Sequence, residues 1–316
     1  MAQLSPEART ATRGSTAHPF ASALLVLAGA SLFGTVGTAQ VLGPDVPADS
    51  LAASRMLVTG ILLVLVAVAF GHGARIAVAL RQAPAWFAGL GQAAFNLCFL
   101  AAMKEAGVAV GTLVAIGAAP VITGLVTRHV TRLWLAATAV AVCGLALLVT
   151  GQQGTPTAPS AAGVILALGA AASYATYIVA GNAAEARGLE TQSFLAAAFT
   201  VAALITLPWL LLGDLAWVGT LGGGLLLGYL VLVPTIFAYS LFNRGLRGVR
   251  SSTASTLALV EPVVAASLAY LLLGERLGAQ GLVGAAMVLL GQLLIVRSAA
   301  GAVPSTDPQV RESAGA

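Results

Sequence analysis

The sequence contains few charged residues. Only 8% of its 316 residues are Asp, Glu, Lys or Arg, whereas 59% are hydrophobic. A soluble globular domain carries about 25% charged residues, which keep its surface in water. The mean hydropathy of +0.95 agrees with this shortage. These values exclude a soluble enzyme and place the chain in a membrane.

The residues that support metal binding, disulfide formation and nucleotide hydrolysis are also scarce. The two cysteines, Cys98 and Cys143, lie singly in apolar runs, so they predict neither a disulfide framework nor a metal cluster. The single lysine, Lys104, is not part of a Walker A loop. No long apolar run contains a histidine or an aspartate. We expect no cofactor, no metal and no enzymatic activity; a membrane-embedded enzyme is the weakest alternative.

Long apolar runs are abundant. A helix needs about 20 such residues to cross the hydrocarbon core of a bilayer, and a helix satisfies its own backbone groups there. Ten runs are long enough. We predict an all-α integral membrane protein with ten transmembrane helices, over residues 20–39, 50–70, 84–103, 107–127, 132–150, 161–180, 192–212, 220–242, 252–273 and 279–297.

The basic residues predict the orientation of these helices. With the N-terminus in the cytoplasm, 12 of the 15 basic residues fall on the cytoplasmic side, and Arg55, Lys104 and Arg276 fall on the other. Cytoplasmic loops are enriched in Lys and Arg. The low Lys and high Ala, Gly and Arg usage is typical of a GC-rich bacterium. We therefore expect a multi-pass protein of a bacterial inner membrane with both termini cytoplasmic.

The second half of the sequence resembles the first. Ala118-Ala119-Pro120-Val121 matches Val260-Glu261-Pro262-Val263, and Gly144 matches Gly291. Each half holds five spans, and this odd number turns the second copy upside down. Inverted repeats are typical of secondary transporters, whose substrate site lies near the midplane between the repeats. We expect tails at 1–19 and 298–316 and two inverted five-helix repeats at 20–151 and 161–297.

This organisation resembles the drug/metabolite transporter superfamily, EamA type. The segments that carry the resemblance are Leu32-Phe33-Gly34-Thr35, Ser54-Arg55-Met56-Leu57, and the stretch from Leu259-Val260-Glu261-Pro262 through Leu273-Gly274-Glu275-Arg276-Leu277 to Gly284-Ala285-Ala286. Thr131-Arg132-Leu133 departs from the family pattern, which has a Gly-Glu turn at that point. The Glu275-Arg276 loop is interpreted as a structural turn between the last two spans.

The resemblance implies a secondary transporter of small metabolites that works by alternating access, often an exporter of amino acids or related compounds. An uncoupled facilitator or a channel is the alternative. We expect a small-molecule substrate and the lipid bilayer as partners, and no nucleic acid. The chain is expected to be a monomer or a weak homodimer. Proton coupling is one of the open alternatives.

Glu261 is the only acidic residue in the interior of a predicted span. An ionisable group at that depth costs about 2.5–3.5 kcal/mol on insertion, so it usually faces the bundle interior or a wet cavity. Glu261 could bind a proton or a substrate amine, or it could fix helix packing beside Pro262. The sequence places no basic residue or histidine at a similar depth.

Five more residues are candidates for lining a substrate cavity. Gln92 and Asn96 lie four apart, hence on one helix face, and their amides could bind a polar substrate or join helices. Tyr174 and Tyr177 could stack on a substrate or make one interhelical hydrogen bond each. Arg55 could bind an anionic group, pair with another residue, or extend to the outer interface.

Three prolines lie in mid-span: Pro120, Pro234 and Pro262. Each lacks a backbone N–H and leaves the carbonyl four residues earlier without its helical partner. Such positions predict either hinges of a transport cycle or static kinks.

Overall fold

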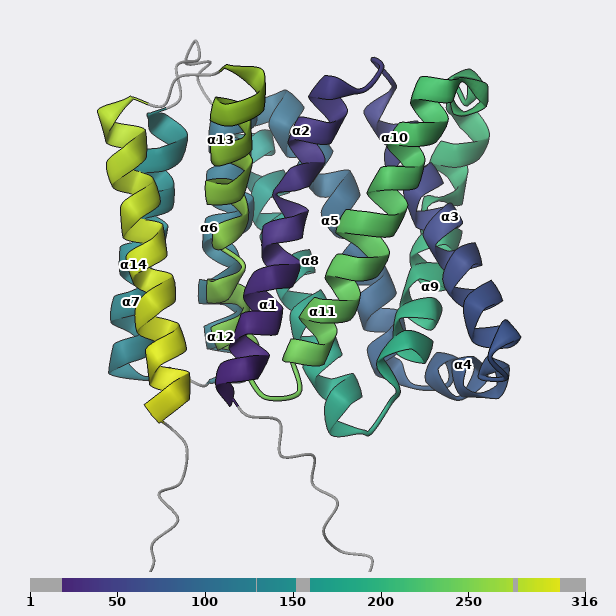
Figure 1. Ribbon diagram of the computed structural model, residues 1–316, viewed down its shortest axis with the longest axis horizontal. Coiled ribbons are helices and arrows are strands. Elements are labelled where there is room, and N and C mark those ends of the chain that lie inside the picture. The colour runs from purple at the N-terminus through teal and green to yellow at the C-terminus, as the bar shows by residue number, and fades with distance from the viewer. Residues whose placement is uncertain (1–18, 129, 152–159, 275–277, 302–316) are drawn as a thin grey trace, which may run out of the picture.

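The computed structural model describes residues 19–128, 130–151, 160–274 and 278–301. The regular elements of the described residues are all helices, and ten segments are long and apolar enough to cross a membrane. The helices stand side by side in one bundle (Figure 1). The ten-helix prediction is therefore confirmed. The Glu275-Arg276 turn and nearly all of both predicted tails lie outside the described residues.

Seven of the spans are single helices. They are α3 (Ala48–Ala69), α5 (Ala83–Ala106), α6 (Val108–Thr127), α7 (Arg132–Thr150), α8 (Ala161–Ala186), α9 (Thr191–Leu212) and α14 (Ala279–Gly301). Most of their ends lie within a few residues of the predicted runs, because apolar length determines where a helix can cross. α8 extends further than predicted, to Ala186. A turn follows α5 where the sequence indicated one, at Gly107, whose φ of 79° suits glycine.

The other three spans are divided into shorter helices, which the apolar runs did not indicate. The first consists of α1 (Pro19–Phe33) and α2 (Thr35–Leu42), the eighth of α10 (Leu221–Val231), a π-helical turn η3 (Leu232–Phe237) and α11 (Ala238–Gly245), and the ninth of α12 (Ser251–Leu257) and α13 (Val260–Leu273). Irregular backbone at membrane depth is tolerated where it is buried in protein or lines a cavity. These three spans therefore indicate where a site can be.

Two of the three mid-span prolines coincide with these irregular segments. Pro234 lies in the π-helical turn, and the carbonyl of Leu230 that it leaves free accepts from the Thr235 hydroxyl at 2.6 Å. Pro262 lies in the first turn of α13, where an N–H has no helical partner in any case. Pro120 differs from its sequence match, because α6 continues through it as one helix.

A short helix, α4 (Gly73–Leu80), occupies the connection between the second and third spans. It is too short to span, and hydropathy gave no sign of it. Its basic flank contacts Glu190 at the start of α9, through Arg75 at 3.2 Å and His72 at 3.4 Å. A hydrogen bond from Ser193, aided by these two neighbours and opposed by burial, holds the pKa of Glu190 below its ordinary range.

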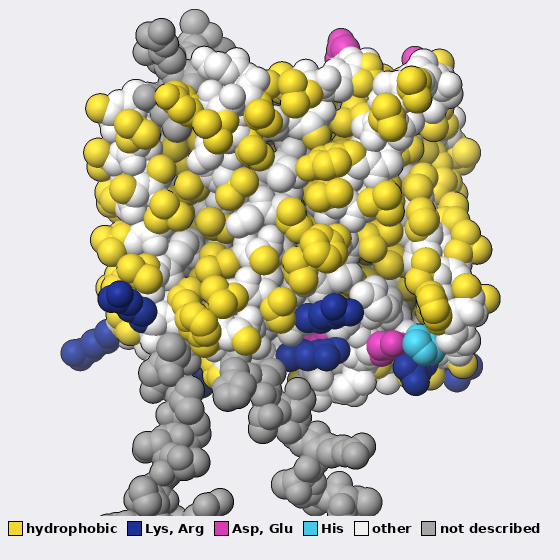
Figure 2. All heavy atoms as spheres, viewed as in Figure 1, with side chains coloured by type: hydrophobic (Ala, Val, Ile, Leu, Met, Phe, Trp, Pro, Cys, Tyr) yellow, Lys and Arg dark blue, Asp and Glu magenta, His cyan; other side chains and the backbone are white. Residues whose placement is uncertain are grey.

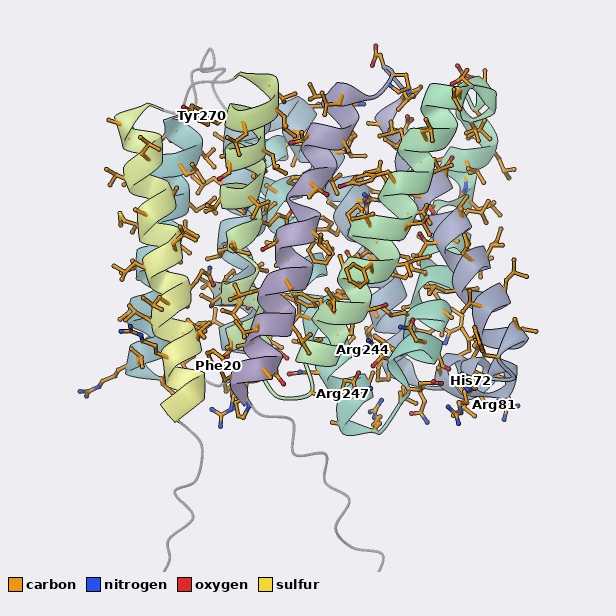
Figure 3. All side chains as sticks on the ribbon, viewed as in Figure 1. Phe20, His72, Arg81, Arg244, Arg247 and Tyr270 are labelled. Carbon is orange, nitrogen blue, oxygen red and sulfur yellow. The ribbon has the colours of Figure 1, made fainter. Side chains whose placement is uncertain are left out.

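The surface separates into an apolar band and two unequal polar faces. Large mid-span side chains such as Leu204 and Leu232 are 61% and 53% exposed in the band, as expected of side chains that face lipid. Lys and Arg gather at the lower edge of Figure 2, where both ends of the described chain lie. Figure 3 labels Arg81, Arg244 and Arg247 there, and Tyr270 at the opposite face. Both ends of the described chain thus lie on the more basic face.

A short 3-10 turn, η2 (Ala216–Gly219), leads into α10. The Trp217 indole in this turn donates to the Ser50 hydroxyl at the start of α3, at 3.0 Å. This bond joins the seventh–eighth connection to the second span at the face opposite the chain ends.

Candidate functional site

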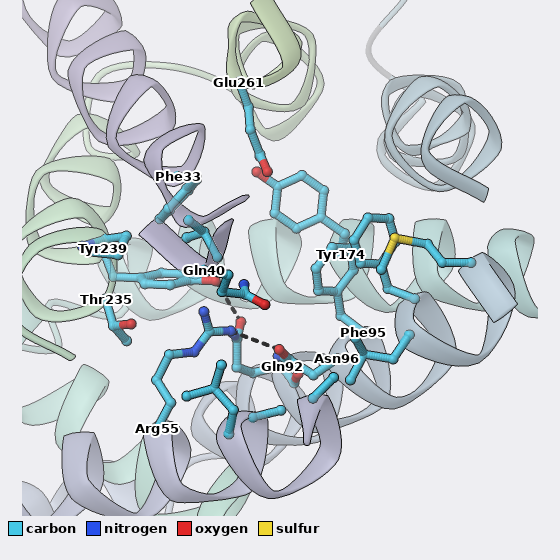
Figure 4. Close-up of a pocket in the computed structure, with 18 residues that line it drawn as sticks. Phe33, Gln40, Arg55, Gln92, Phe95, Asn96, Tyr174, Thr235, Tyr239 and Glu261 are labelled. Carbon is cyan, nitrogen blue, oxygen red and sulfur yellow. Dashed lines mark hydrogen bonds between the residues drawn. The ribbon is translucent and has the colours of Figure 1, made fainter. Parts of the chain in front are cut away.

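A polar cavity of about 160 Å³ lies inside the bundle (Figure 4). At about 30 Å³ per water, this volume suits several waters or one small metabolite. The cavity is lined by Phe33, Val36, Gln40, Ala48, Leu51, Ala52, Arg55, Gln92, Phe95, Asn96, Phe99, Leu100, Met103, Tyr174, Pro234, Thr235, Tyr239 and Glu261. These residues come from the first, second, third, sixth, eighth and ninth spans.

The cavity extends toward the face opposite the chain ends. Its lining runs from Glu261 to Gln40 near the end of α2, Ala48 at the start of α3 and Met103 near the end of α5. Gln40 is exposed. Because α2 ends and α3 begins at the face opposite the chain ends (Figure 1), Gln40 and Ala48 place one end of the cavity near that face.

A chain of hydrogen bonds orients the polar groups of the cavity. An Arg55 guanidinium N–H donates to Asn96 Oδ1 at 2.8 Å, and the Asn96 amide donates to the Gln92 carbonyl at 2.8 Å. The Tyr239 hydroxyl donates to Gln92 Oε1 at 2.9 Å. Arg55 therefore lies in the cavity wall rather than at the outer interface, and its guanidinium is held by an amide that carries no charge.

Glu261 projects into the same cavity from the start of α13 (Figure 4). The positive end of the α13 dipole favours a negative charge there. No hydrogen bond or ion pair of the Glu261 carboxylate occurs within the described residues. Arg55 lines the cavity with it, so the prediction that no basic residue lies at this depth is wrong. Helix α3 begins at Ala48, which places Arg55 in its third turn rather than at its end.

Two buried polar atoms of the cavity have no partner. Arg55 Nε and the Tyr174 hydroxyl are both buried, and neither makes a hydrogen bond in the described structure. A buried polar group without a partner costs about 1–3 kcal/mol. Both residues line the cavity, so a polar ligand or water could satisfy these two atoms.

Gly34 allows the first and ninth spans, which are both divided, to meet beside Glu261. A Cβ at this position would lie 2.5 Å from the Glu261 carbonyl oxygen and 2.9 Å from Val264 Cβ. Only a residue without a side chain lets the backbones approach so closely. The joint between α1 and α2 therefore packs directly against the start of α13, which positions Glu261.

Aromatic rings form much of the cavity wall. Phe95 stacks on Phe99 with centroids 5.2 Å apart and contacts Tyr174 at 5.5 Å. Phe33 lies 4.7 Å from Tyr239. These rings combine an apolar surface with hydroxyl groups, a lining that is typical of small-molecule sites.

Tyr177 lies behind the cavity. Its ring contacts Tyr239 edge-on at 5.1 Å, and its hydroxyl accepts from the Asn243 amide at 2.6 Å. Tyr177 is not among the lining residues, whereas Tyr174, Gln92 and Asn96 are. Tyr174 and Tyr177, three residues apart on one helix, thus differ in position: Tyr174 lines the cavity and Tyr177 lies behind its wall.

The sequence candidates are brought together only in part. Arg55, Gln92, Asn96, Tyr174, Glu261 and Pro234 line the cavity, and Pro120, Pro262 and Tyr177 do not. No described residue of the fourth span lines the cavity. Tyr239 and Thr235 were missed. Their position beside Pro234 in the eighth span was the one available signal. The described residues contain no group of three His, Cys, Asp or Glu that could hold a metal ion.

Comparison with known proteins gives matches over most of the chain. A profile of the EamA-like transporter family matches residues 161–297. An uncharacterized transporter, YwfM, of Bacillus subtilis (strain 168) is 36% identical over 286 residues, which are 86% of this chain and 92% of that protein. A putative permease-like protein, YdzE, of the same organism is 33% identical over 69 residues, 22% of this chain and 88% of that protein.

The fold also has a match among solved structures. One crystal structure superposes with a TM-score of 0.74 and covers 88% of this chain and 97% of its own. The two sequences are 19% identical, so this likeness concerns the fold alone.

Proposed function

Because the chain belongs to the EamA-like transporter family, we propose that it is a secondary transporter of small zwitterionic metabolites, such as amino acids or related compounds. The proposal includes alternating access and export as the direction of transport. The observation that carries it is the presence of Arg55 and Glu261 in one cavity without an ion pair between them. The direction rests on the resemblance alone.

A zwitterion suits this pair of charges. A guanidinium binds a carboxylate through two parallel hydrogen bonds, and Arg55 Nε is free to make one of them. The Glu261 carboxylate would accept from the ammonium group. A charge without a partner is costly in a low-dielectric site, so a ligand that carries both charges relieves both residues at once.

Proton coupling would follow from the same carboxylate. In the empty cavity Glu261 would take a proton, and the substrate ammonium would displace it. The proton and the substrate would then bind to Glu261 in turn and never together, so that proton entry could drive substrate exit. The position of Glu261 on the wall of an accessible cavity supports this part of the proposal.

Matching contacts support two inverted repeats. Gly29 packs against Ala238, and Gly169 packs against Cys98. Gly169 lies 140 residues after Gly29, and Ala238 lies 140 residues after Cys98. The contact in one half of the sequence therefore maps onto the other contact. The residue before α8 bonds to the end of α5, at the face opposite the start of α1. The first helices of the two halves therefore run in opposite directions.

A second pair of contacts gives the same relation. Gly144 of α7 lies against Gly284 of α14, with the carbonyl of Gly284 2.7 Å from a Cβ built on Gly144. Gly291 lies against Ala137 at the same 2.7 Å. Gly291 and Gly284 follow Gly144 and Ala137 by 147 residues each. We therefore treat the halves 20–151 and 161–297 as repeats that exchange conformations in the transport cycle.

Contacts on the side of the chain ends favour a carrier over a pore. Tyr239 packs on Tyr177 directly beyond the cavity. Closer to the chain ends, Arg247 Nε lies 2.7 Å from a Glu185 carboxylate oxygen and joins the turn after α11 to α8. In the proposed cycle these contacts would close the route on the side of the chain ends, while the cavity opens on the other side. The basic character of the blocked side supports cytoplasmic termini.

Flux through proteoliposomes tests the proposed substrate class. A neutral amino acid should be transported better than its decarboxylated amine or its deaminated acid. Arg55→Gln should raise the KM for the amino acid by about 10- to 100-fold, as expected for the loss of charged hydrogen bonds worth about 1.5–3 kcal/mol. Transport of the amine should not change.

Arg244→Gln is the matched control, because it removes an exposed arginine outside the cavity. This variant should transport like the wild type. Unchanged amino-acid KM in Arg55→Gln, or a wild-type preference for the amine or the acid, would contradict the proposal.

A further inference from the structure

A second hollow lies on the lipid-facing surface, apart from the central cavity. Its volume is about 450 Å³, and it lies between α5, α6 and α8. The lining residues are Ala83, Pro84, Phe87, Ile122, Val126, Ala172, Ala175, Thr176, Val179, Ala180, Ala183 and Arg187. It shares no residue with the central cavity. We call it the α5–α6–α8 groove.

The lining of the groove is apolar except at one end. Phe87 and Val126 on its walls are 56% and 64% exposed, as suits side chains in contact with lipid. The Thr176 hydroxyl bonds to the carbonyl of Ala172 in its own helix, which leaves the floor without a free hydroxyl. Arg187 ends α8 and is exposed at the mouth. It forms none of the ion pairs found among the described residues.

The length of the groove matches one leaflet. The groove follows α8 from Ala172, near the helix middle, to Arg187 at its end, which is about 22 Å at 1.5 Å per residue. Half of a bilayer with its headgroups is about 20–22 Å thick. The apolar floor therefore lies at the depth of the acyl chains, and the guanidinium lies at the depth of the phosphates.

The width of the groove decides what can fill it. Spread over that length, its volume corresponds to a cross-section of about 20 Å². A helix with side chains is about 10 Å across, and its cross-section is therefore about four times larger. A cross-section of this size suits one methylene chain, and a helix of a second copy could enter the groove only with its side chains.

We propose that the α5–α6–α8 groove binds one anionic phospholipid of the leaflet on the side of the chain ends. One of its two acyl chains lies along the small residues of α8, and its phosphate binds Arg187. Charge complementarity at the mouth distinguishes this lipid from a zwitterionic one. The binding does not depend on the substrate of the central cavity.

Native mass spectrometry of the purified full-length chain tests the site. The protein is titrated with phosphatidylglycerol or with phosphatidylcholine of identical acyl chains. Wild type should retain one phosphatidylglycerol in preference to phosphatidylcholine. Arg187→Gln should weaken phosphatidylglycerol binding about fivefold, the equivalent of ~1 kcal/mol for one arginine at a membrane surface. Phosphatidylcholine binding should change less, because its own ammonium group balances the phosphate charge.

A second variant tests the acyl-chain part of the groove. Thr176→Phe places a ring in the groove and should reduce the binding of both lipids. Two matched controls lie outside it: Arg244→Gln removes an exposed arginine, and Leu204→Phe adds a ring at a side chain that is 61% exposed. Both controls should bind like the wild type.

Three results would overturn the proposal. The first is equal phosphatidylglycerol binding by Arg187→Gln and Arg244→Gln, and the second is equal lipid binding by Thr176→Phe and Leu204→Phe. The third is a protein dimer, in place of the lipid adduct, that Thr176→Phe abolishes. That result would assign the groove to a second copy of the chain.

Discussion

Gly34→Ala perturbs the point where the first and ninth spans meet. Gly34 has φ −61° and ψ −14°, a helical conformation that alanine adopts without strain. By conformation alone, alanine should stabilise the fold by about 0.5–1 kcal/mol. Packing has the opposite effect, since the new Cβ would lie 2.5 Å from the Glu261 carbonyl oxygen.

The steric effect should exceed the conformational one. The closest atom belongs to the backbone, so no side-chain rotation relieves the clash, and overpacking of this kind costs about 1–3 kcal/mol. We expect a net destabilisation of about 1–2 kcal/mol. Thermal unfolding in one detergent measures it. Flux should also fall, because the start of α13 and Glu261 with it must move.

Gly37→Ala is the matched control for this prediction. Gly37 lies in α2, one turn after Gly34, and no atom lies within 4 Å of a Cβ built there. This variant should be as stable as the wild type or more stable by up to about 1 kcal/mol. If Gly34→Ala is as stable as Gly37→Ala, the close approach of the two spans is wrong.

Three more predictions concern single side chains. The lowered pKa of Glu190 stabilises the fold above the ordinary carboxyl value of 4.5, and this stability is lost as the pH falls through the lowered value. Glu190→Gln should therefore lose less thermal stability between pH 7 and the acid range, and an equal loss would contradict the contacts of Glu190. A cysteine at Asn96, with Cys98 and Cys143 replaced by serine, should be protected from a thiol reagent by substrate, and unchanged labelling would remove Asn96 from the site. Glu261→Gln should still move substrate down its gradient but should lose its response to a pH gradient, whereas the same response in both proteins would refute proton coupling.

The sequence predicts the spans well because hydropathy depends only on local composition. An apolar run of about 20 residues crosses a membrane wherever its neighbours lie. The division of the first span at Gly34 depends instead on contact with Glu261, which is more than 200 residues away in the sequence. Local sequence also fails to separate Pro120 from Pro262. The two prolines match in sequence, but one lies inside a continuous helix and the other in the first turn of a helix.

Part of the candidate site could be predicted in the same way. Gln92 and Asn96 were placed on one helix face by their spacing alone, and both line the cavity. The position of Arg55 opposite Glu261 could not be derived, because it depends on how the second span packs beside the ninth. Tyr239 was missed for the same reason, since its bond to Gln92 joins two spans from different halves.

Counterflow in proteoliposomes tests the central claim, that one cavity carries a zwitterion by alternating access, most directly. Vesicles with wild-type protein are loaded with an unlabelled neutral amino acid and placed in a trace of the same labelled compound. The label should accumulate transiently above its outside concentration, with saturable dependence on substrate, and Arg55→Gln should abolish the accumulation at the same substrate concentration. Simple equilibration of the label in wild-type vesicles, without accumulation, would contradict a carrier and indicate a pore.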